Sequence, residues 1–166
     1  ALYSFSVFDN NYNKVTFPMF AAAVKFNLSP ALLENLGEDF LLFFYNDNSK
    51  IRLAVAVAVK NEALVAAEML KQEETLPSDA EFLFLGNEPE NNSGKFGQGF
   101  YRGAAVKYLN LSQQNTFSID YIINDASLVI GTSKNTAQAV FDSLSIKGLL
   151  TEDILPTEKQ ENDSGD

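Results

Sequence analysis

The sequence predicts an α+β domain in which helices pack on an antiparallel sheet. Strand-like segments are joined by Asn-Asp turns at residues 46–48 and 124–125, and such residues suit antiparallel hairpins because they tolerate left-handed backbone. Two segments, 63–70 and 137–144, repeat apolar residues at helical spacing. With 46% hydrophobic residues in 166, the chain can also bury one substantial core.

The first part of the chain predicts two strands followed by a short helix. Alternating apolar residues favour strands at Leu2–Phe8 and Val15–Phe20. We expect the helix at Ser29–Leu36, with Ser29 as its N-cap and Pro30 at its first position. Gly37 is then the expected helix stop.

The segment Leu42–Val59 predicts a hairpin that leads into a helix. In Ile51–Val59 both alternating faces are apolar, so this strand should be central and covered on both sides, with its alanine face allowing a helix to approach closely. A helix should open at Lys60–Ala63, and further strands are expected at Glu81–Leu85 and Gly103–Leu109.

The last ordered elements are a strand that ends near Ile123, a strand at Ser127–Gly131 and a helix that opens at Lys134. In the first of these strands, Phe117, Ile119, Tyr121 and Ile123 share one face, whereas Ser118, Asp120 and Ile122 form the other. We therefore expect that strand to be half exposed.

The two halves resemble each other, and the sequence predicts strand-strand-helix repeats at about 39–74 and 117–146. Ala63, Ala66, Ala67 and Leu70 each have an apolar counterpart 74 residues later, in Ala137, Val140, Phe141 and Leu144. The repeat predicts that both helices bury these residues on the same kind of sheet face. Chance similarity between two such units is the alternative.

Composition divides the chain into a domain at residues 1–150 and an acidic, largely disordered tail at 151–166. The tail has six acidic residues and no apolar residue after Pro156, so it cannot offset the entropy of ordering. Deleting Thr157–Asp166 should leave the melting temperature unchanged within about two degrees. An acidic docking tail is the alternative. Asn87–Gly99 is a loop by composition.

Charge and residue usage exclude several classes of function. There are 12 Lys and Arg against 22 Asp and Glu, a net charge of −10, so we expect no nucleic-acid partner. The chain has no Cys and no His, which removes thiol nucleophiles, Ser-His dyads and the usual zinc, haem and iron-sulfur ligands. We expect no cofactor and identify no catalytic, cofactor-binding or metal-ligating residue.

Two loops resemble ligand-binding motifs but depart from them. Asp9–Asn13 has the alternating Asp and Asn residues of a calcium loop, yet Lys14 replaces the required Gly and Phe20 the required Glu. Gly94–Gly99 resembles a phosphate-binding loop but lacks its Gly-Lys-Ser/Thr ending. We interpret the first segment as a hairpin turn between two strands and the second as a flexible loop.

Carboxylates are the remaining candidates for acid-base chemistry. Glu73 and Glu74 are adjacent near a helix end, so they should point in different directions. Asp120 lies mid-strand, and Tyr108, Lys107 and Arg102 are its expected neighbours; an exposed face or a structural ion pair is the favoured interpretation.

Four aromatic residues flank predicted turns and are candidates for a surface contact with another protein: Tyr12, Phe96, Phe100 and Tyr101.

One resemblance rests on the order of elements and on two short segments. These are Glu73–Asp79 and the strand-to-helix junction Ser127–Lys134, of which Leu-Val-Ile-Gly-Thr-Ser is the most recognisable part. Over about residues 39–144 the chain resembles the extracytoplasmic portions of uncharacterised bacterial single-pass membrane proteins. The resemblance implies a location outside the cytoplasmic membrane and carries over no catalytic residue.

We therefore expect a noncatalytic extracytoplasmic binding or assembly module of a bacterial envelope protein, with a protein partner. No window approaches the ~18 consecutive apolar residues of a membrane span, so membrane association would need an anchor outside this chain. The chain enters a strand-like pattern directly at Ala1, which leaves an upstream signal peptide or anchor open. The alternatives are a carboxylate-based hydrolase of a small or carbohydrate substrate and a cytoplasmic regulatory module.

Overall fold

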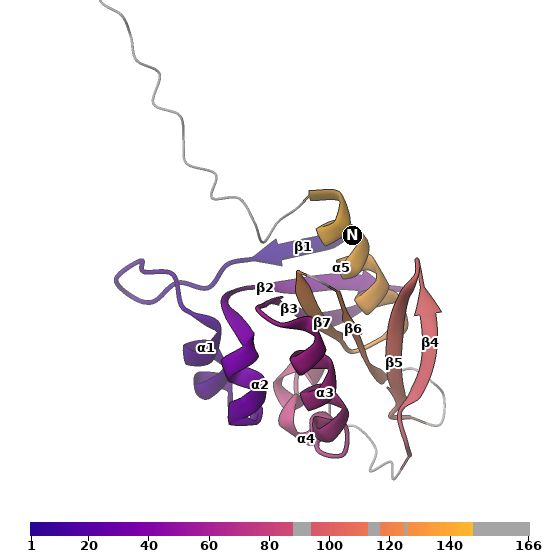
Figure 1. Ribbon diagram of the computed structural model, residues 1–166. Helices are drawn as coiled ribbons and strands as arrows, with labels where there is room; N and C mark the ends of the chain where they lie inside the picture. The colour runs from indigo at the N-terminus through magenta and orange to yellow at the C-terminus, as the bar shows by residue number, and fades with distance from the viewer. Residues whose placement is uncertain (88–93, 113–116, 125, 148–166) are drawn as a thin grey trace, which may run out of the picture.

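The computed structural model describes residues 1–87, 94–112, 117–124 and 126–147. Within these residues, seven strands form one antiparallel sheet in the order β1-β2-β3-β7-β6-β5-β4, and helices cover it (Figure 1). The predicted α+β class is therefore confirmed. The expected tail at 151–166 lies outside the described residues. The strands are β1 Leu2–Phe5, β2 Leu36–Asp47, β3 Lys50–Val59, β4 Gly97–Tyr101, β5 Ala104–Asn110, β6 Ser118–Ile123 and β7 Ser127–Gly131.

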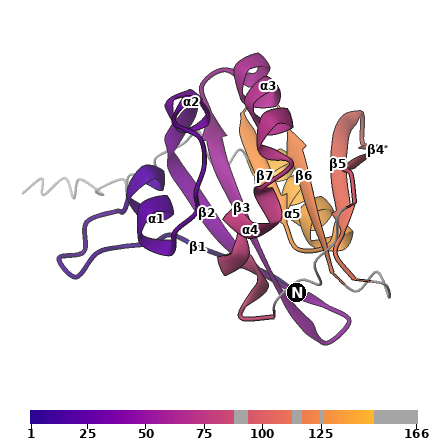
Figure 2. The same ribbon diagram turned by 90° about the horizontal axis from the view of Figure 1, so that it is seen from below.

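The helices divide between the two faces of the sheet, because β3 is apolar on both. Leu53, Val55 and Val57 pack in the core beneath the amino-terminal helix layer. Ala54 and Ala56, which alternate with them, pack against the carboxy-terminal helix on the other face. Figures 1 and 2 show this division. The helices are α1 Phe17–Val24, α2 Pro30–Asn35, α3 Glu62–Gln72, α4 Leu76–Asp79, the 3-10 helix η1 Glu81–Phe84 and α5 Lys134–Lys147.

Local signals for turns and helix starts are confirmed. Asn48 and Ser49 both have positive φ in the tight β2–β3 turn, as an Asn-rich hairpin requires. Ser29 caps α2 by accepting a hydrogen bond from the Leu32 N–H, and Asn61 caps α3 by accepting one from the Leu64 N–H.

Three expectations about individual segments are wrong. Val15–Phe20 is not a strand, since Phe17, Phe20 and Ala21 are buried at helical spacing and α1 forms instead. Glu81–Leu85 is not a strand either, because η1 occupies it. Gly37 does not terminate α2 as a left-handed cap. It lies in β2, where a Cβ would come within 2.8 Å of the Ala58 Cβ.

The predicted buried face of α3 is also wrong. Val65, Met69 and Gln72 are buried, whereas Leu70 is 53% exposed. In α5 the predicted face is confirmed, with Ala137, Val140, Phe141 and Leu144 all buried. The matched positions thus play different roles, and α3 and α5 lie on opposite faces of the sheet. The proposed repeat is not confirmed.

Strand β6 is buried on both faces, contrary to the expected half-exposed strand. Ile119 and Tyr121 join the core under α3, and Ile122 joins a second cluster with Phe141 under α5. Helix α5 therefore covers the strand face formed by Ser118, Asp120 and Ile122. Two of these three residues, Ser118 and Asp120, are polar. This coverage places the polar side chains of β6 beneath α5.

Candidate functional site

A cleft of about 340 Å³ opens between the first turns of α5 and the adjacent ends of β5 and β6. Its floor comes from alternate residues on neighbouring strands, because Tyr108 pairs with Asp120 and Asn110 pairs with Ser118. Lys134 and Gln138 lie one helical turn apart on α5 and form the other side. The lining residues are Gly99, Phe100, Val106, Tyr108, Asn110, Ser118, Asp120, Lys134 and Gln138.

Two glycines in the edge strand β4 shape this cleft. A Cβ at Gly97 would come within 2.7 Å of Tyr108 Cζ, so the tyrosine ring lies directly over this glycine. At Gly99 the nearest atom to such a Cβ is Tyr108 Cε1, at 3.9 Å. A side chain at Gly99 would therefore enter the cleft without a backbone clash, which makes this position a useful one for blocking the site.

Asp120 is the most unusual group in the cleft. Its side chain is 2% exposed and accepts a short hydrogen bond from Ser118 Oγ. Burial raises the pKa of Asp120 to about 6, although the Ser118 hydrogen bond and the positive charge of Lys134 both act to lower it. The expected exposed face is thus wrong. A carboxyl group with a raised pKa inside a cleft is a candidate functional group.

A second depression of about 380 Å³ adjoins the cleft and shares Asn110, Ser118 and Lys134 with it. We call these two adjoining depressions together the α5 trough. The second depression is lined by Asp47, Asn48, Lys50, Arg52, Asn110, Ser118, Ser133, Lys134 and Asn135.

Asp47 attaches the β2–β3 hairpin to the start of α5. Its carboxylate accepts hydrogen bonds from Ser133 Oγ and Asn135 Nδ2, each at 3.0 Å. Ser133 Oγ in turn accepts from the Thr136 N–H and so caps the helix. A carboxylate at a helix amino terminus is stabilised by the helix dipole, so Asp47 already occupies the place of an anion there.

The basic residues of the trough differ in their surroundings. Arg52 is 4% exposed, and its guanidinium lies 4.0 Å from the centroid of the Phe117 ring. Burial lowers the pKa of Arg52, and the nearby Asp47 partly opposes this effect. Lys50 and Lys134 are exposed, and neither forms an ion pair with any residue that the structure describes.

The four aromatic residues proposed for a surface contact are not brought together. Tyr12 is 89% exposed on the β1–α1 loop, at the opposite edge of the sheet from β4, where Phe100 is 75% exposed (Figure 1). Phe96 packs near Tyr121, and the hydroxyl group of Tyr101 donates to Asp142. Of the four, Phe100 alone contributes to the trough lining. The four residues share no common surface, and their contact with one partner stays a prediction.

The two loop motifs have structural explanations. Asp9 accepts hydrogen bonds from the backbone N–H groups of Asn13 and Asn11, which lower its pKa and close a turn. A strand precedes this turn, as predicted, but α1 follows it instead of a second strand. In Gly94–Gly99, residues 97–99 belong to β4. No group of three His, Cys, Asp or Glu residues in the described part of the chain could hold a metal ion.

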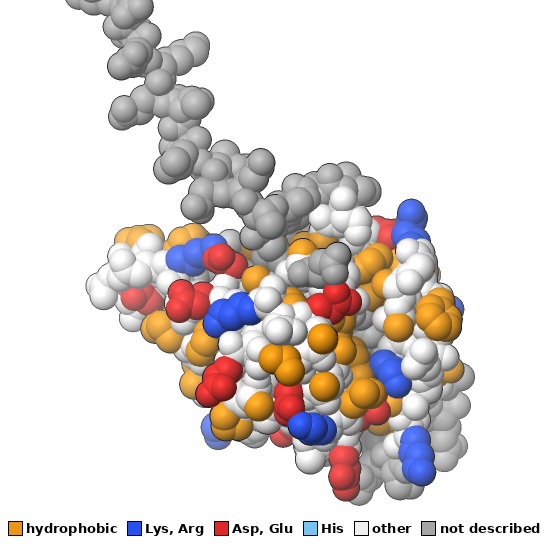
Figure 3. All heavy atoms as spheres, viewed as in Figure 1, with side chains coloured by type: hydrophobic (Ala, Val, Ile, Leu, Met, Phe, Trp, Pro, Cys, Tyr) orange, Lys and Arg blue, Asp and Glu red, His pale blue; other side chains and the backbone are white. Residues whose placement is uncertain are grey.

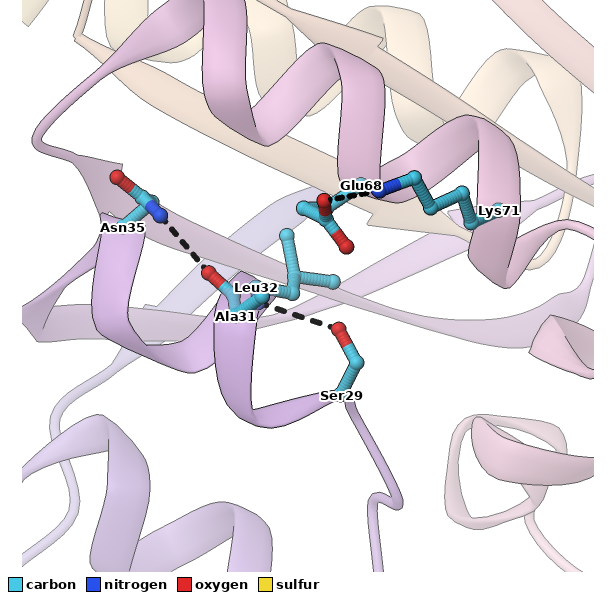
Figure 4. A network of polar contacts seen from close by, with 6 residues as sticks. All are labelled: Ser29, Ala31, Leu32, Asn35, Glu68 and Lys71. Carbon is cyan, nitrogen blue, oxygen red and sulfur yellow. Dashed lines mark hydrogen bonds and ion pairs between the residues drawn. The ribbon is translucent and has the colours of Figure 1, made fainter.

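Polar groups on the other face also have structural roles. Glu73 accepts a hydrogen bond from the Tyr121 hydroxyl at 2.7 Å, and Lys107 Nζ lies 3.9 Å from the same carboxylate. The contacts in Figure 4 are the Ser29 cap of Leu32, an Asn35 bond to the Ala31 carbonyl and the Lys71–Glu68 ion pair. Each joins residues three or four positions apart in or at the start of one helix, so they stabilise α2 and α3.

On the face seen in Figure 3, acidic and basic side chains are interspersed with scattered apolar ones. None of the described helices is long and apolar enough to cross a membrane. Comparison of the chain with protein-family models, with curated proteins and with solved structures finds no match in any of the three. The functional proposal therefore rests on the geometry of the trough.

Of the trough residues, the sequence pattern indicates Asp120, its neighbour Tyr108 and Phe100 as candidates, but it does not indicate the other polar groups. Asn110, Ser118, Lys134 and Gln138 come from three elements that meet only in the folded sheet.

Proposed function

We propose that this chain is a noncatalytic binding module that takes a small polar ligand in the α5 trough. The observation that carries the proposal is the buried Asp120 carboxyl in a cleft whose other polar lining residues are Lys134 and neutral side chains. Such convergent polar groups in a concave site fix the orientation of a ligand. The trough is of a size that suits a small molecule.

We further propose that the module works outside the cytoplasmic membrane, as part of a bacterial envelope protein. The support is the resemblance at Ser127–Lys134. The full gene is the direct test, since an upstream signal peptide or membrane span would agree with this location. A gene that encodes neither would contradict it.

A carboxylate-based hydrolase is the second candidate, and the raised pKa of Asp120 favours it because a general acid needs a pKa near neutrality. Hydrolysis with two carboxylates needs a second acidic group at the same bond. Among the described residues that line the cleft, Asp120 is the one carboxylate, and Asp47 in the adjoining depression is held by Ser133 and Asn135. The arrangement thus supports binding better than catalysis.

A fragment screen by NMR tests the proposal. Small polar fragments should shift the amide signals of residues such as Val106, Tyr108 and Gln138. Gly99→Leu should abolish these shifts, because the new side chain enters the cleft. Gln98→Leu is the matched control, since it adds the same side chain to the same strand on the opposite face.

Two results would contradict the proposal. In one, no fragment shifts the trough amides of the folded protein. In the other, Gly99→Leu and Gln98→Leu leave equal shifts, which would place the bound fragments elsewhere.

A further inference from the structure

We infer that the α5 trough binds a free amino acid with an uncharged side chain, held by its ammonium group at Asp120 and by its carboxylate at Lys134. This inference rests on the proposed function and adds the chemical class of the ligand. It follows from the two charged groups of the cleft, because these have opposite signs and form no ion pair with each other.

Most polar side chains of the second depression already have partners within the protein, so they do not define the ligand. Ser133 and Asn135 donate hydrogen bonds to Asp47. The amide of Asn48 donates to the same carboxylate at 3.2 Å. We therefore place the ligand in the cleft beside Asp120, where several groups are still available.

Asp120 has one carboxylate oxygen available to a ligand. Its Oδ1 accepts the short hydrogen bond from Ser118 Oγ, but within the described part of the chain no group donates to Oδ2. Because Asp120 lines the cleft, a ligand that fills the cleft would displace water from this oxygen. Covering it without a donor would cost free energy, so the ligand must bring an N–H or O–H group there. An ammonium group provides the strongest such contact, since its hydrogen bond to a carboxylate is charge-assisted.

Lys134 supplies the opposite charge on the α5 side of the cleft. It is exposed and forms no ion pair with any described residue. Its positive charge acts on the carboxyl group of Asp120 and so lies near it. A purely cationic ligand would be repelled by Lys134, and a purely anionic one by Asp120. A ligand that carries both charges close together, as an amino acid does, matches both residues.

Gln138 and Tyr108 add neutral groups that suit the same ligand. The Gln138 amide lies one helical turn after Lys134, has no hydrogen-bond partner among the described residues and can donate to a ligand carboxylate. The Tyr108 ring, which lies over Gly97, offers apolar surface to an uncharged side chain. At about 340 Å³ the cleft is near the lower end of the range for small-molecule sites, which suits a ligand of this size.

NMR titration of the whole chain with the standard L-amino acids tests the inference. At least one amino acid with an uncharged side chain should shift the amide signals of Val106, Tyr108 and Gln138. Each binder is then compared with three analogues. The N-acetyl derivative lacks the positive charge, the carboxamide lacks the negative charge, and the N-trimethyl form keeps both charges but has no N–H group. Each analogue should bind at least about tenfold more weakly, as the loss of one good charged contact implies.

Variants assign each contact to its residue. Lys134→Gln should weaken binding of the amino acid about tenfold and leave binding of its carboxamide unchanged. Asp120→Asn should weaken binding of the amino acid about tenfold and leave binding of its N-acetyl derivative unchanged. Lys71→Gln and Asp39→Asn are the matched controls, because each removes an exposed charge outside the trough. Gly99→Leu should remove binding of every probe.

The outcomes separate this inference from the proposed function. Equal binding of an amino acid and any of its three analogues overturns the inference, and so does an equal loss of binding in the control variants. Binding of acidic or basic amino acids alone overturns it as well. Failure of every amino acid has the same meaning when polar fragments still shift the trough amides, since the binding module then stands. An absence of shifts from fragments and amino acids alike contradicts the proposed function itself.

Discussion

Replacing the buried Asp120 with asparagine should stabilise the protein at neutral pH. In the folded chain burial raises the pKa of this carboxyl group from the usual 3.8 to about 6. At 1.36 kcal/mol for each pH unit, that difference corresponds to about 3 kcal/mol of unfavourable free energy once the group is ionised in both states. The asparagine side chain would keep the volume and an acceptor for Ser118 while removing the buried charge.

The effect should depend on pH in a defined direction. Because the pKa of the folded state lies above that of the unfolded state, the folded protein binds more protons between pH 3.8 and about 6, and its stability falls as pH rises through this window. Lys134 and Tyr108 are the other titratable groups that face Asp120 in the cleft. Asp120→Asn should therefore gain about 1 to 3 kcal/mol at pH 7 and almost nothing at pH 3.5.

Urea unfolding of the wild type and the variant, followed by circular dichroism from pH 3.5 to 8, measures this difference. Asp39→Asn is the control, because Asp39 is an exposed partner of Lys14 and should change stability little at any pH. A variant that is equally or less stable than the wild type at pH 7 would refute the reasoning. So would a gain that does not vary with pH. The variant should also bind the trough ligand more weakly, so stability and binding should change in opposite directions.

Further changes test the packing that forms the trough, each by the shift in free energy of unfolding in urea. Phe141→Ala should cost about 3 to 5 kcal/mol, because the Phe141 ring is buried between α5 and the sheet. Leu70→Ala should change stability by at most about 0.5 kcal/mol, because Leu70 is half exposed. Similar losses for the two variants would contradict the assigned helix faces. Gly131→Ala should cost about 1 to 3 kcal/mol, since a Cβ there would lie 3.0 Å from the Ala137 backbone nitrogen, and a neutral result would mean that α5 shifts freely. Ser133→Ala should cost about 1 to 2 kcal/mol through the lost cap and the lost bond to Asp47, and no loss would show that the hairpin does not hold the helix.

Features that depend on neighbouring residues were predictable from the sequence. The Asn48 turn, the Ser29 cap and the helix start at Lys60–Ala63 each need only a few adjacent residues, and all three are confirmed. The two apolar faces of β3 were predictable for the same reason, because alternation along one strand fixes which residues share a face.

Features that depend on tertiary packing were not predictable in this way. In α3, small alanines and Leu70 suggested one face, but the larger Val65 and Met69 fill the space beneath the helix and decide its rotation. The segment at Val15–Phe20 fits both a strand and a helix pattern over so few residues, and packing against Phe40 selects the helix.

The position of α5 explains why Asp120 is buried in a cleft and not sealed in the core. The absence of a side chain at Gly131 and the small Ala54 and Ala56 let the helix lie close to β7 and β3, near the middle of the sheet. From there it covers β6 but packs less extensively on β5, and the glycines of β4 add no side chains that would fill the gap. The polar side chains from Asn110 to Asp120 are consequently covered by α5 on one side and open on the other. A carboxyl group in that position loses most of its hydration, which raises its pKa, and yet it lines a cleft, as the proposed binding of a polar molecule needs.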